Sequence, residues 1–217
     1  MLIISQNASN YNIPFPEKTV YRINLAWVNS IEELEDLLKK HKEQQIFLDL
    51  PKGRIKPPNN KYVLEDIFPI LNAYTNIKYF AVSNVNSSED LSIYTKVIPH
   101  EIIIVPKIES PKAVLNIKDI VEAIPTTKKF LMLDHDDLFS NLIKNNEPTT
   151  KFTEYIKDLT KFCDANNISL LRTSMTSESI LWLLSMVKSF NDSSSWFPIL
   201  IKRGTVIVLL PLSNKLR

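Results

Sequence analysis

The amino-acid sequence predicts an α/β protein built as a (β/α)8 barrel, the TIM-barrel fold, for three reasons. Short β-branched apolar runs alternate with helical patterns along all 217 residues. The predicted strands are apolar without interruption, which is typical of parallel strands buried on both faces. Eight strands of this kind fit a closed barrel better than the alternative, an open doubly wound sheet. We therefore expect residues 1–217 to form one barrel domain.

The predicted strands are short apolar runs, and the predicted helices show apolar residues three and four positions apart. The strands lie at residues 2–5, 20–24, 46–50, 79–83, 102–105, 130–133, 168–172 and 206–210. The helices lie after Ser30, at 63–74, after Ser87, after Ser110, at 152–166 and at 179–190. A longer polar insertion follows the sixth strand, and the run at 199–201 is ambiguous. Because only seven residues, 211–217, follow the last strand, we expect a minimal barrel that lacks its final helix.

Composition excludes several classes of protein. Glycine occurs only twice, at Gly53 and Gly204, so no glycine-rich phosphate loop can be written. The 26 basic and 24 acidic residues give a net charge of +2, which offers no electrostatic attraction for nucleic acid or an acidic membrane. The single cysteine, Cys163, excludes an internal disulfide and favours a reducing compartment. Since we see neither a secretory signal nor a membrane-spanning run, we expect a cytoplasmic protein.

Polar side chains stand at the predicted strand ends, which is where the active sites of such barrels lie. Lys107 and Glu109 follow four apolar residues, and residues two apart on a strand share a face. A cation and a carboxylate on one inward face suit chemistry on a metal ion and an anion. The alternative interpretation is an ordinary ion pair at a strand end.

Residues 134–137, with the sequence Asp-His-Asp-Asp, directly follow the sixth predicted strand. Mg²⁺ and similar cations take carboxylate oxygens, often from one or two side chains. Glu109 and one of these aspartates would supply such a pair. The alternative is an acid-rich helix N-terminus, which the helix dipole favours.

Seven segments resemble pyruvate kinase, in the same order along nearly the whole chain. They are Val20-Tyr21-Arg22-Ile23-Asn24, Leu48-Asp49-Leu50, Ile55-Lys56, Phe80-Ala81-Val82-Ser83 with Ser88-Glu89-Asp90-Leu91, Pro106-Lys107-Ile108-Glu109-Ser110, Asp137-Leu138 and Arg172-Thr173-Ser174-Met175. Seven segments in order are far more specific than any one of them. The resemblance implies a pyruvate-kinase-like barrel of the phosphoenolpyruvate/pyruvate superfamily.

The resemblance also implies a role for each matching side chain. Glu109 and Asp137 would hold Mg²⁺ or Mn²⁺, and Lys107 would stabilise an enolate oxygen or a transferred phosphoryl group. Arg22 would bind a phosphate or carboxylate, and Thr173 would lie beside the reacting carbon. The other implied roles are substrate binding by Lys56, Ser83 and Asp136, and K⁺ binding by Asn24 and Asp49.

The sequence departs from that family in ways that change the expected reaction. Only residues 57–62 stand where the family inserts its nucleotide lid, and the family's C-terminal domain is absent. Ala26 and Leu50 replace the other two K⁺ ligands. Asp136 and Phe139 replace two glycines whose backbone N–H groups bind the substrate carboxylate in the family. ADP phosphorylation is therefore not expected.

Three functions remain open at the level of sequence. The first is a divalent-metal-dependent enzyme of the phosphoenolpyruvate/pyruvate barrel class, acting on a small anionic 2-oxo acid or its enolate as a lyase, aldolase or decarboxylase. The second is a catalytically degenerate barrel that serves as a binding or assembly module. The third is phosphotransfer with the lid supplied by a partner. Trp196 and its neighbours would either cover the open end of the barrel or form an interface with another copy or a protein partner.

The histidines and the cysteine are expected to have structural rather than chemical roles. His41 and His100 lie in polar stretches and are expected at the surface, and neither has a metal-ligand spacing with another histidine. Cys163 lies on a predicted helix and is expected to pack in its apolar face.

Overall fold

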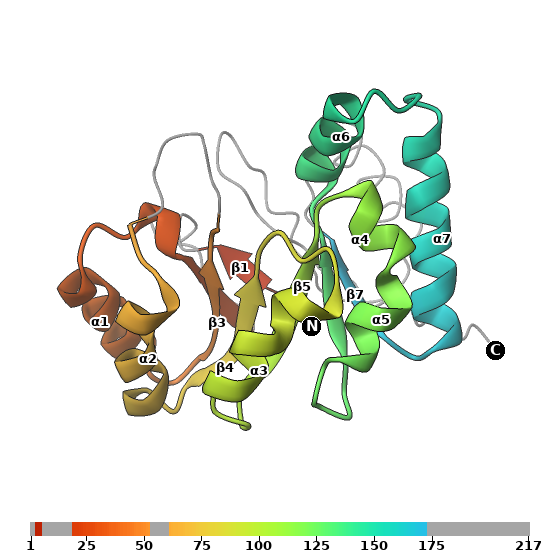
Figure 1. Cartoon of the computed structure of the whole chain (residues 1–217). Helices are drawn as coiled ribbons and strands as arrows, with labels where there is room; N and C mark the ends of the chain where they lie inside the picture. Colours follow the sequence, from red (N-terminus) through yellow and green to blue (C-terminus); the bar gives the residue numbers. More distant parts are fainter. Residues whose placement is uncertain (1–2, 6–18, 53–60, 173–217) are drawn as a thin grey trace, which may run out of the picture.

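A computed structural model describes residues 3–5, 19–52 and 61–172, which form a curled parallel sheet with helices on its outer side (Figure 1). Seven strands are described: β1 (Ile3–Ser5), β2 (Val20–Asn24), β3 (Gln45–Leu50), β4 (Ile77–Val82), β5 (Ile103–Ile108), β6 (Phe130–Leu133) and β7 (Ser169–Arg172). Each strand pairs with the next one in sequence, always in parallel. Sequential parallel order is the order of a TIM barrel. The predicted strand at 206–210 and the predicted helix at 179–190 lie outside the described residues.

The described helices connect the ends of successive strands. They are η2 (Leu25–Trp27), α1 (Ile31–Lys40), α2 (Leu64–Ala73), η3 (Ser88–Leu91), α3 (Ser92–Val97), α4 (Pro111–Leu115), α5 (Ile117–Glu122), α6 (His135–Lys144) and α7 (Lys151–Ala165). The start of α1 shows why these segments are helical. Ser30 Oγ accepts a hydrogen bond from the Glu33 N–H, and the Glu33 carboxylate accepts one from the Asn29 N–H. The Ser30 bond satisfies a helix-terminal donor, as predicted, whereas the reciprocal bond of Glu33 goes to Asn29, one residue before the N-cap, and not to Ser30 as in a full capping box.

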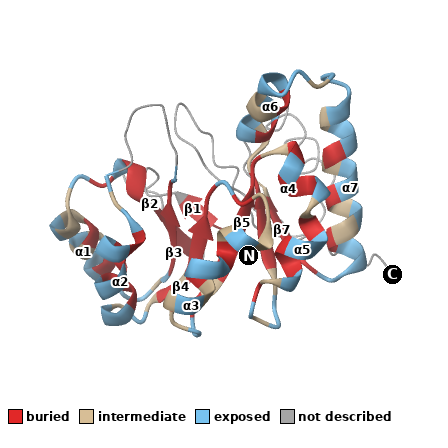
Figure 2. Ribbon diagram, viewed as in Figure 1, coloured by how far each residue is buried: buried red, intermediate tan, exposed pale blue. Residues whose placement is uncertain are grey.

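Alternation along the strands divides the apolar side chains between two cores. On β2, Tyr21 and Ile23 belong to the large core shared with the helices, and Figure 2 shows buried residues along the strands and on parts of the helices. The other face carries a smaller inner core of strand residues: Ile3, Val20, Phe47, Tyr79, Ala81, Val105, Phe130, Met132 and Leu171. Because side chains on one face recur every two residues, the next inward positions follow at the carboxyl ends of the strands. Those positions are polar: Arg22, Asp49, Ser83, Lys107, Glu109 and Asp134. We call these six residues the polar rim.

Two elements differ from the sequence prediction. The fifth strand does not end before Pro106 but continues to Ile108, so that Lys107 lies within the strand. The strand pairs with β4 up to Pro106 and with β6 from Lys107 onward. Proline, which has no N–H to donate, thus falls where β5 changes partners. The polar insertion after the sixth strand is the helix α6, which is capped by Asp134 and buries Leu138 and Leu142.

The environment of His41 also differs from the prediction. His41 ends α1 and is buried rather than exposed, because the chain turns back there over β2. Its ring stacks on Tyr21 with 3.7 Å between centroids, and its Nδ1 is hydrogen-bonded to the Gln44 side chain. His100 is exposed and Cys163 is buried in α7, both as predicted. Among the described helices, none has the length and apolar character that crossing a bilayer requires.

Candidate functional site

The polar rim begins with a buried ion pair between β2 and β3. Arg22 Nε donates to Asp49 Oδ2 at 3.1 Å, and the Arg22 Nη2 contacts the same oxygen more closely. The two residues are only 8% and 1% exposed. Asn24 lies two residues beyond Arg22, and its side-chain oxygen accepts the Ala26 N–H at 3.0 Å to cap η2. Asn24 and Asp49 therefore both have partners within the protein, and their K⁺-binding role stays a prediction.

Lys107 lies within the polar rim, and its ammonium has oxygen atoms around it from the end of its own strand β5 and from the ends of β4 and β6. Its Nζ is 2.6 Å from Glu109 Oε1 and 3.9 Å from Asp134 Oδ2. It also donates to Ser83 Oγ at 3.4 Å. Burial by itself would lower the pKa of Lys107, but the negative charges of Asp49, Glu109 and Asp134 outweigh it and hold this pKa above its ordinary value. Lys107 is therefore a permanent positive charge in a buried site.

Glu109 directly follows β5, and both of its carboxylate oxygens are fixed by partners. Oε1 accepts from Lys107, and Oε2 accepts the backbone N–H of Asn84 at 2.6 Å. Asn84 has a left-handed backbone, with φ of 56°, which asparagine tolerates better than most residues. Burial raises the pKa of Glu109 above its ordinary value, while the charge of Lys107 and the Asn84 hydrogen bond oppose that rise. Removing this carboxylate from water has a cost that a bound cation would offset.

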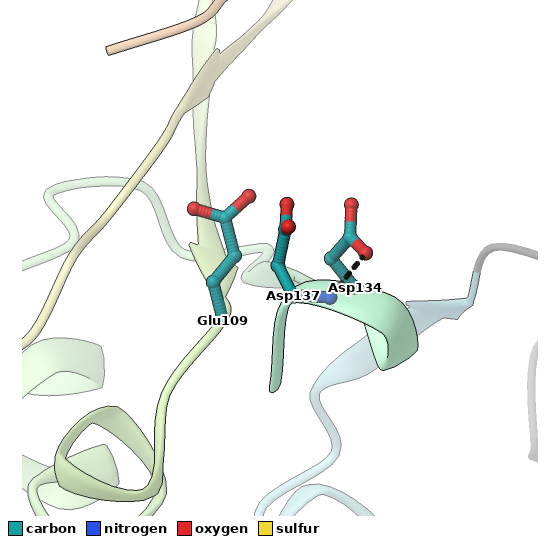
Figure 3. A group of neighbouring side chains, drawn as sticks. All are labelled: Glu109, Asp134 and Asp137. Carbon is teal, nitrogen blue, oxygen red and sulfur yellow. Dashed lines mark hydrogen bonds between the residues drawn. The ribbon is translucent and has the colours of Figure 1, made fainter. Parts of the chain in front are cut away.

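Three carboxylates come together at the ends of β5 and β6 (Figure 3), and two of them lie within 4 Å of Lys107 Nζ. Glu109, Asp134 and Asp137 each offer one oxygen, and these oxygens lie within 4.8 Å of one another. Asp134 follows β6 as the N-cap of α6, where its Oδ1 accepts the Asp137 N–H at 3.3 Å. Glu109 is buried, Asp134 is partly buried and Asp137 is exposed, so the cluster reaches from the interior to solvent. We call these three residues the acid cluster.

The acid cluster suits a divalent cation in both donor type and charge. All its donors are carboxylate oxygens, the ligands that Mg²⁺ and Mn²⁺ prefer. The site as a whole holds four carboxylates and two cationic side chains, which leaves an excess of two negative charges when all are ionised. These six residues are Asp49, Glu109, Asp134 and Asp137 with Arg22 and Lys107. One divalent cation would balance that excess.

The structure brings together most of the residues that the sequence singled out. Glu109, Asp137 and Lys107 are neighbours, Ser83 joins them through Lys107, and the Arg22–Asp49 pair lies farther along the same rim. Asp136, a predicted substrate-binding residue, is exposed. The described ion pairs of the two buried cations are made with Asp49 and Glu109, not with Asp136. Three of the predicted functional residues, Lys56, Thr173 and Trp196, lie outside the described residues.

Sequence reasoning paired Glu109 with one aspartate of residues 134–137, whereas the structure brings two of them to it. Asp134 joins Asp137 in the acid cluster, and a signal for it existed: it lies two residues after the inward-facing Met132. Asn84 holds Glu109 through its backbone N–H, and nothing in its sequence context marks that contact. Asn141 on α6 adds a bond to the Glu109 carbonyl oxygen at 2.8 Å, which ties α6 to the end of β5.

Comparisons with known proteins identify the type of fold but not the activity. No protein-family model matches the sequence, and no curated protein matches it. The solved structure of RipC from Yersinia pestis is 18% identical and has a TM-score of 0.54, covering 80% of this chain and 78% of RipC. An HpcH/HpaI aldolase from Desulfitobacterium hafniense DCB-2 is 13% identical and has a TM-score of 0.56, covering 91% of this chain and 95% of the aldolase.

These likenesses confirm the fold prediction at the level of an α/β, TIM-barrel-like chain. They do not support the narrower prediction that the barrel is that of a pyruvate kinase. The chain therefore has the type of fold found in an HpcH/HpaI aldolase, with an acid cluster and a buried lysine at the carboxyl ends of its strands.

Proposed function

We propose that this chain is a divalent-metal-dependent lyase or aldolase that stabilises the enolate of a small 2-oxo acid. The observation that carries the proposal is the acid cluster lying directly beside the buried ammonium of Lys107. A metal site next to a fixed positive charge suits a reaction in which an oxygen atom gains negative charge. The similarity to an HpcH/HpaI aldolase supports this reaction class through fold analogy.

Each residue of the site has a distinct part in the proposed reaction. Glu109, Asp134 and Asp137 would hold Mg²⁺ or Mn²⁺, which when bound supplies Lewis-acid polarisation of a carbonyl oxygen. Lys107 would stabilise the negative charge that develops on that oxygen, because its ammonium stays protonated in the buried site. Arg22, oriented by Asp49, would attract the carboxylate of the substrate.

Phosphotransfer to a nucleotide is not part of this proposal. With only two glycines in the chain, no glycine-rich phosphate loop can form. Residues 57–62 are also too few to make a nucleotide-covering domain before α2 (Leu64–Ala73). Enolate formation needs neither feature.

The test is metal-dependent exchange of the methyl protons of pyruvate in D₂O, followed by proton NMR. We expect exchange that requires Mg²⁺, stops with EDTA, and falls at least 100-fold in Glu109→Gln and in Lys107→Met. Glu122→Gln, which changes an exposed glutamate of α5, is the matched control and should leave the rate unchanged. If neither pyruvate nor 2-oxobutyrate exchanges faster with the protein and Mg²⁺ than with Mg²⁺ alone, the proposed enolate chemistry is wrong.

A second candidate is a catalytically degenerate barrel, and one observation favours it. Both buried cations already have internal partners, Arg22 with Asp49 and Lys107 with Glu109. A site closed by its own ion pairs needs no substrate anion to balance it. On this account Lys107→Met has no effect on the biological role of the protein, and no proton exchange occurs with any 2-oxo acid.

A further inference from the structure

We propose that the ammonium of Lys107 and the divalent cation compete for the same carboxylates, so that metal binding displaces Lys107 toward the substrate. This inference rests on the proposed function, because it assumes that the acid cluster is a metal site. It adds an order of events: the metal binds first, and the freed lysine then receives the anion.

The first support is the position of the lysine nitrogen. Lys107 Nζ is 2.6 Å from Glu109 Oε1 and 3.9 Å from Asp134 Oδ2, so it contacts two of the three members of the acid cluster. The other oxygen of Glu109 already accepts the Asn84 N–H at 2.6 Å. A cation entering the cluster must therefore share Glu109 with an ammonium, and the two positive charges repel each other at short range.

The second support is that the polar rim offers the Lys107 ammonium other oxygen atoms to contact. Ser83 Oγ, which follows β4 and is not a member of the acid cluster, lies 3.4 Å from Nζ. Beyond it, the carboxylate of Asp49 on β3 also attracts the charge of Lys107. Since a lysine has a flexible four-carbon stem, the ammonium can move from Glu109 toward Ser83 and Asp49 while its backbone stays in β5.

The arrangement has a functional consequence. Without metal, Lys107 neutralises the buried Glu109, which is only 4% exposed and would otherwise be an isolated charge. With metal, the cation takes over that role and the ammonium is released for an anionic ligand. By linkage, metal and anion would then each strengthen the binding of the other.

The experiment combines NMR of the lysine side chain with calorimetry of metal binding. In protein labelled with ¹³C-lysine, the Cε signal of Lys107 is identified by its absence in Lys107→Met. We expect Mg²⁺ to shift this signal in the wild type, and Lys107→Met to bind Mg²⁺ at least tenfold more tightly by calorimetry. Lys118→Met, which changes an exposed lysine of α5, is the matched control and should bind as the wild type does.

Each outcome of this experiment decides between the claims. Heat of Mg²⁺ binding with an unmoved Lys107 signal overturns the competition and leaves the metal site standing. Mg²⁺ binding by Lys107→Met alone would show that the lysine excludes the metal from the wild type, which overturns both the displacement and the metal-dependent function. No binding by either protein overturns both the competition and the metal-dependent function. If Lys107→Met folds poorly, Lys107→Arg, which keeps the buried positive charge, identifies the same Cε signal by its absence, and the Mg²⁺-induced shift is then read in the wild type.

Discussion

Replacing Asp134 by asparagine separates the two roles of this residue, which caps α6 and belongs to the acid cluster. Asparagine is as good an N-cap as aspartate, so its side-chain oxygen should still accept the Asp137 N–H. The charge, however, is lost. The cluster oxygens all lie within 4.8 Å of one another, and taking that limit as an upper bound for the distance from Asp134 to a bound cation, the attraction between a unit charge and a divalent ion is about 1.7 kcal/mol in water. This corresponds to about 20-fold in metal affinity, and partial burial makes it a lower bound.

The assay is a Mn²⁺ titration followed by calorimetry, together with thermal unfolding of the metal-free protein. We expect Asp134→Asn to bind Mn²⁺ at least 20-fold more weakly while its melting temperature stays within about 2 °C of the wild type. Asp134→Ala should lose the same affinity and also the cap, worth about 1 kcal/mol and about 2–4 °C for a chain of this size. If Asp134→Asn binds Mn²⁺ as tightly as the wild type, Asp134 is a cap and nothing more, and the reasoning fails.

Three further predictions concern groups outside the acid cluster. Asp49→Asn leaves the buried charge of Arg22 without its ion-pair partner and should lower the free energy of unfolding by about 3–5 kcal/mol. The double change Arg22→Met with Asp49→Leu should recover most of that loss. Equal urea midpoints for Asp49→Asn and the wild type would contradict this prediction. Burial lowers the pKa of His41, so the folded protein resists its protonation and loses stability as the pH falls below about 6.5. His41→Phe, which keeps the stacking on Tyr21, should reduce the drop in urea midpoint between pH 7.5 and pH 5, and an unchanged drop would refute the assignment. Burial raises the pKa of Cys163 to about 12, so iodoacetamide at pH 8 should modify it only after unfolding; rapid modification of the native protein would show that the thiol is accessible.

The strands of this protein could be predicted from sequence because their apolar runs are long and uninterrupted. Parallel strands buried on both faces give that pattern, and all seven described strands lie where it predicts them. The extent of β5 was missed, because Pro106 normally argues against a central strand and its tolerance depends on which neighbour each half of the strand bonds. The start of α6 was offered from sequence only as the alternative interpretation of residues 134–137, and its extent was not predicted, because the segment after Leu133 has the polar character of a loop.

The candidate site was predicted in part, for a similar reason. Lys107 and Glu109 could be paired from their spacing on one strand, which fixes them on the same face. The contact of Asn84 with Glu109 could not be predicted, since it depends on a left-handed backbone conformation in a loop. The burial of His41 depends on the turn of the chain after α1, which places its ring on Tyr21 of a neighbouring element.

The central claim is that Glu109, Asp134 and Asp137 hold one divalent cation. The most direct measurement is anomalous scattering from a crystal of the protein soaked in Mn²⁺. The account predicts a single strong peak within bonding distance of all three carboxylates, with the ammonium of Lys107 moved away from Glu109. A map with no peak between these side chains, and with Lys107 still bound to Glu109, would contradict it.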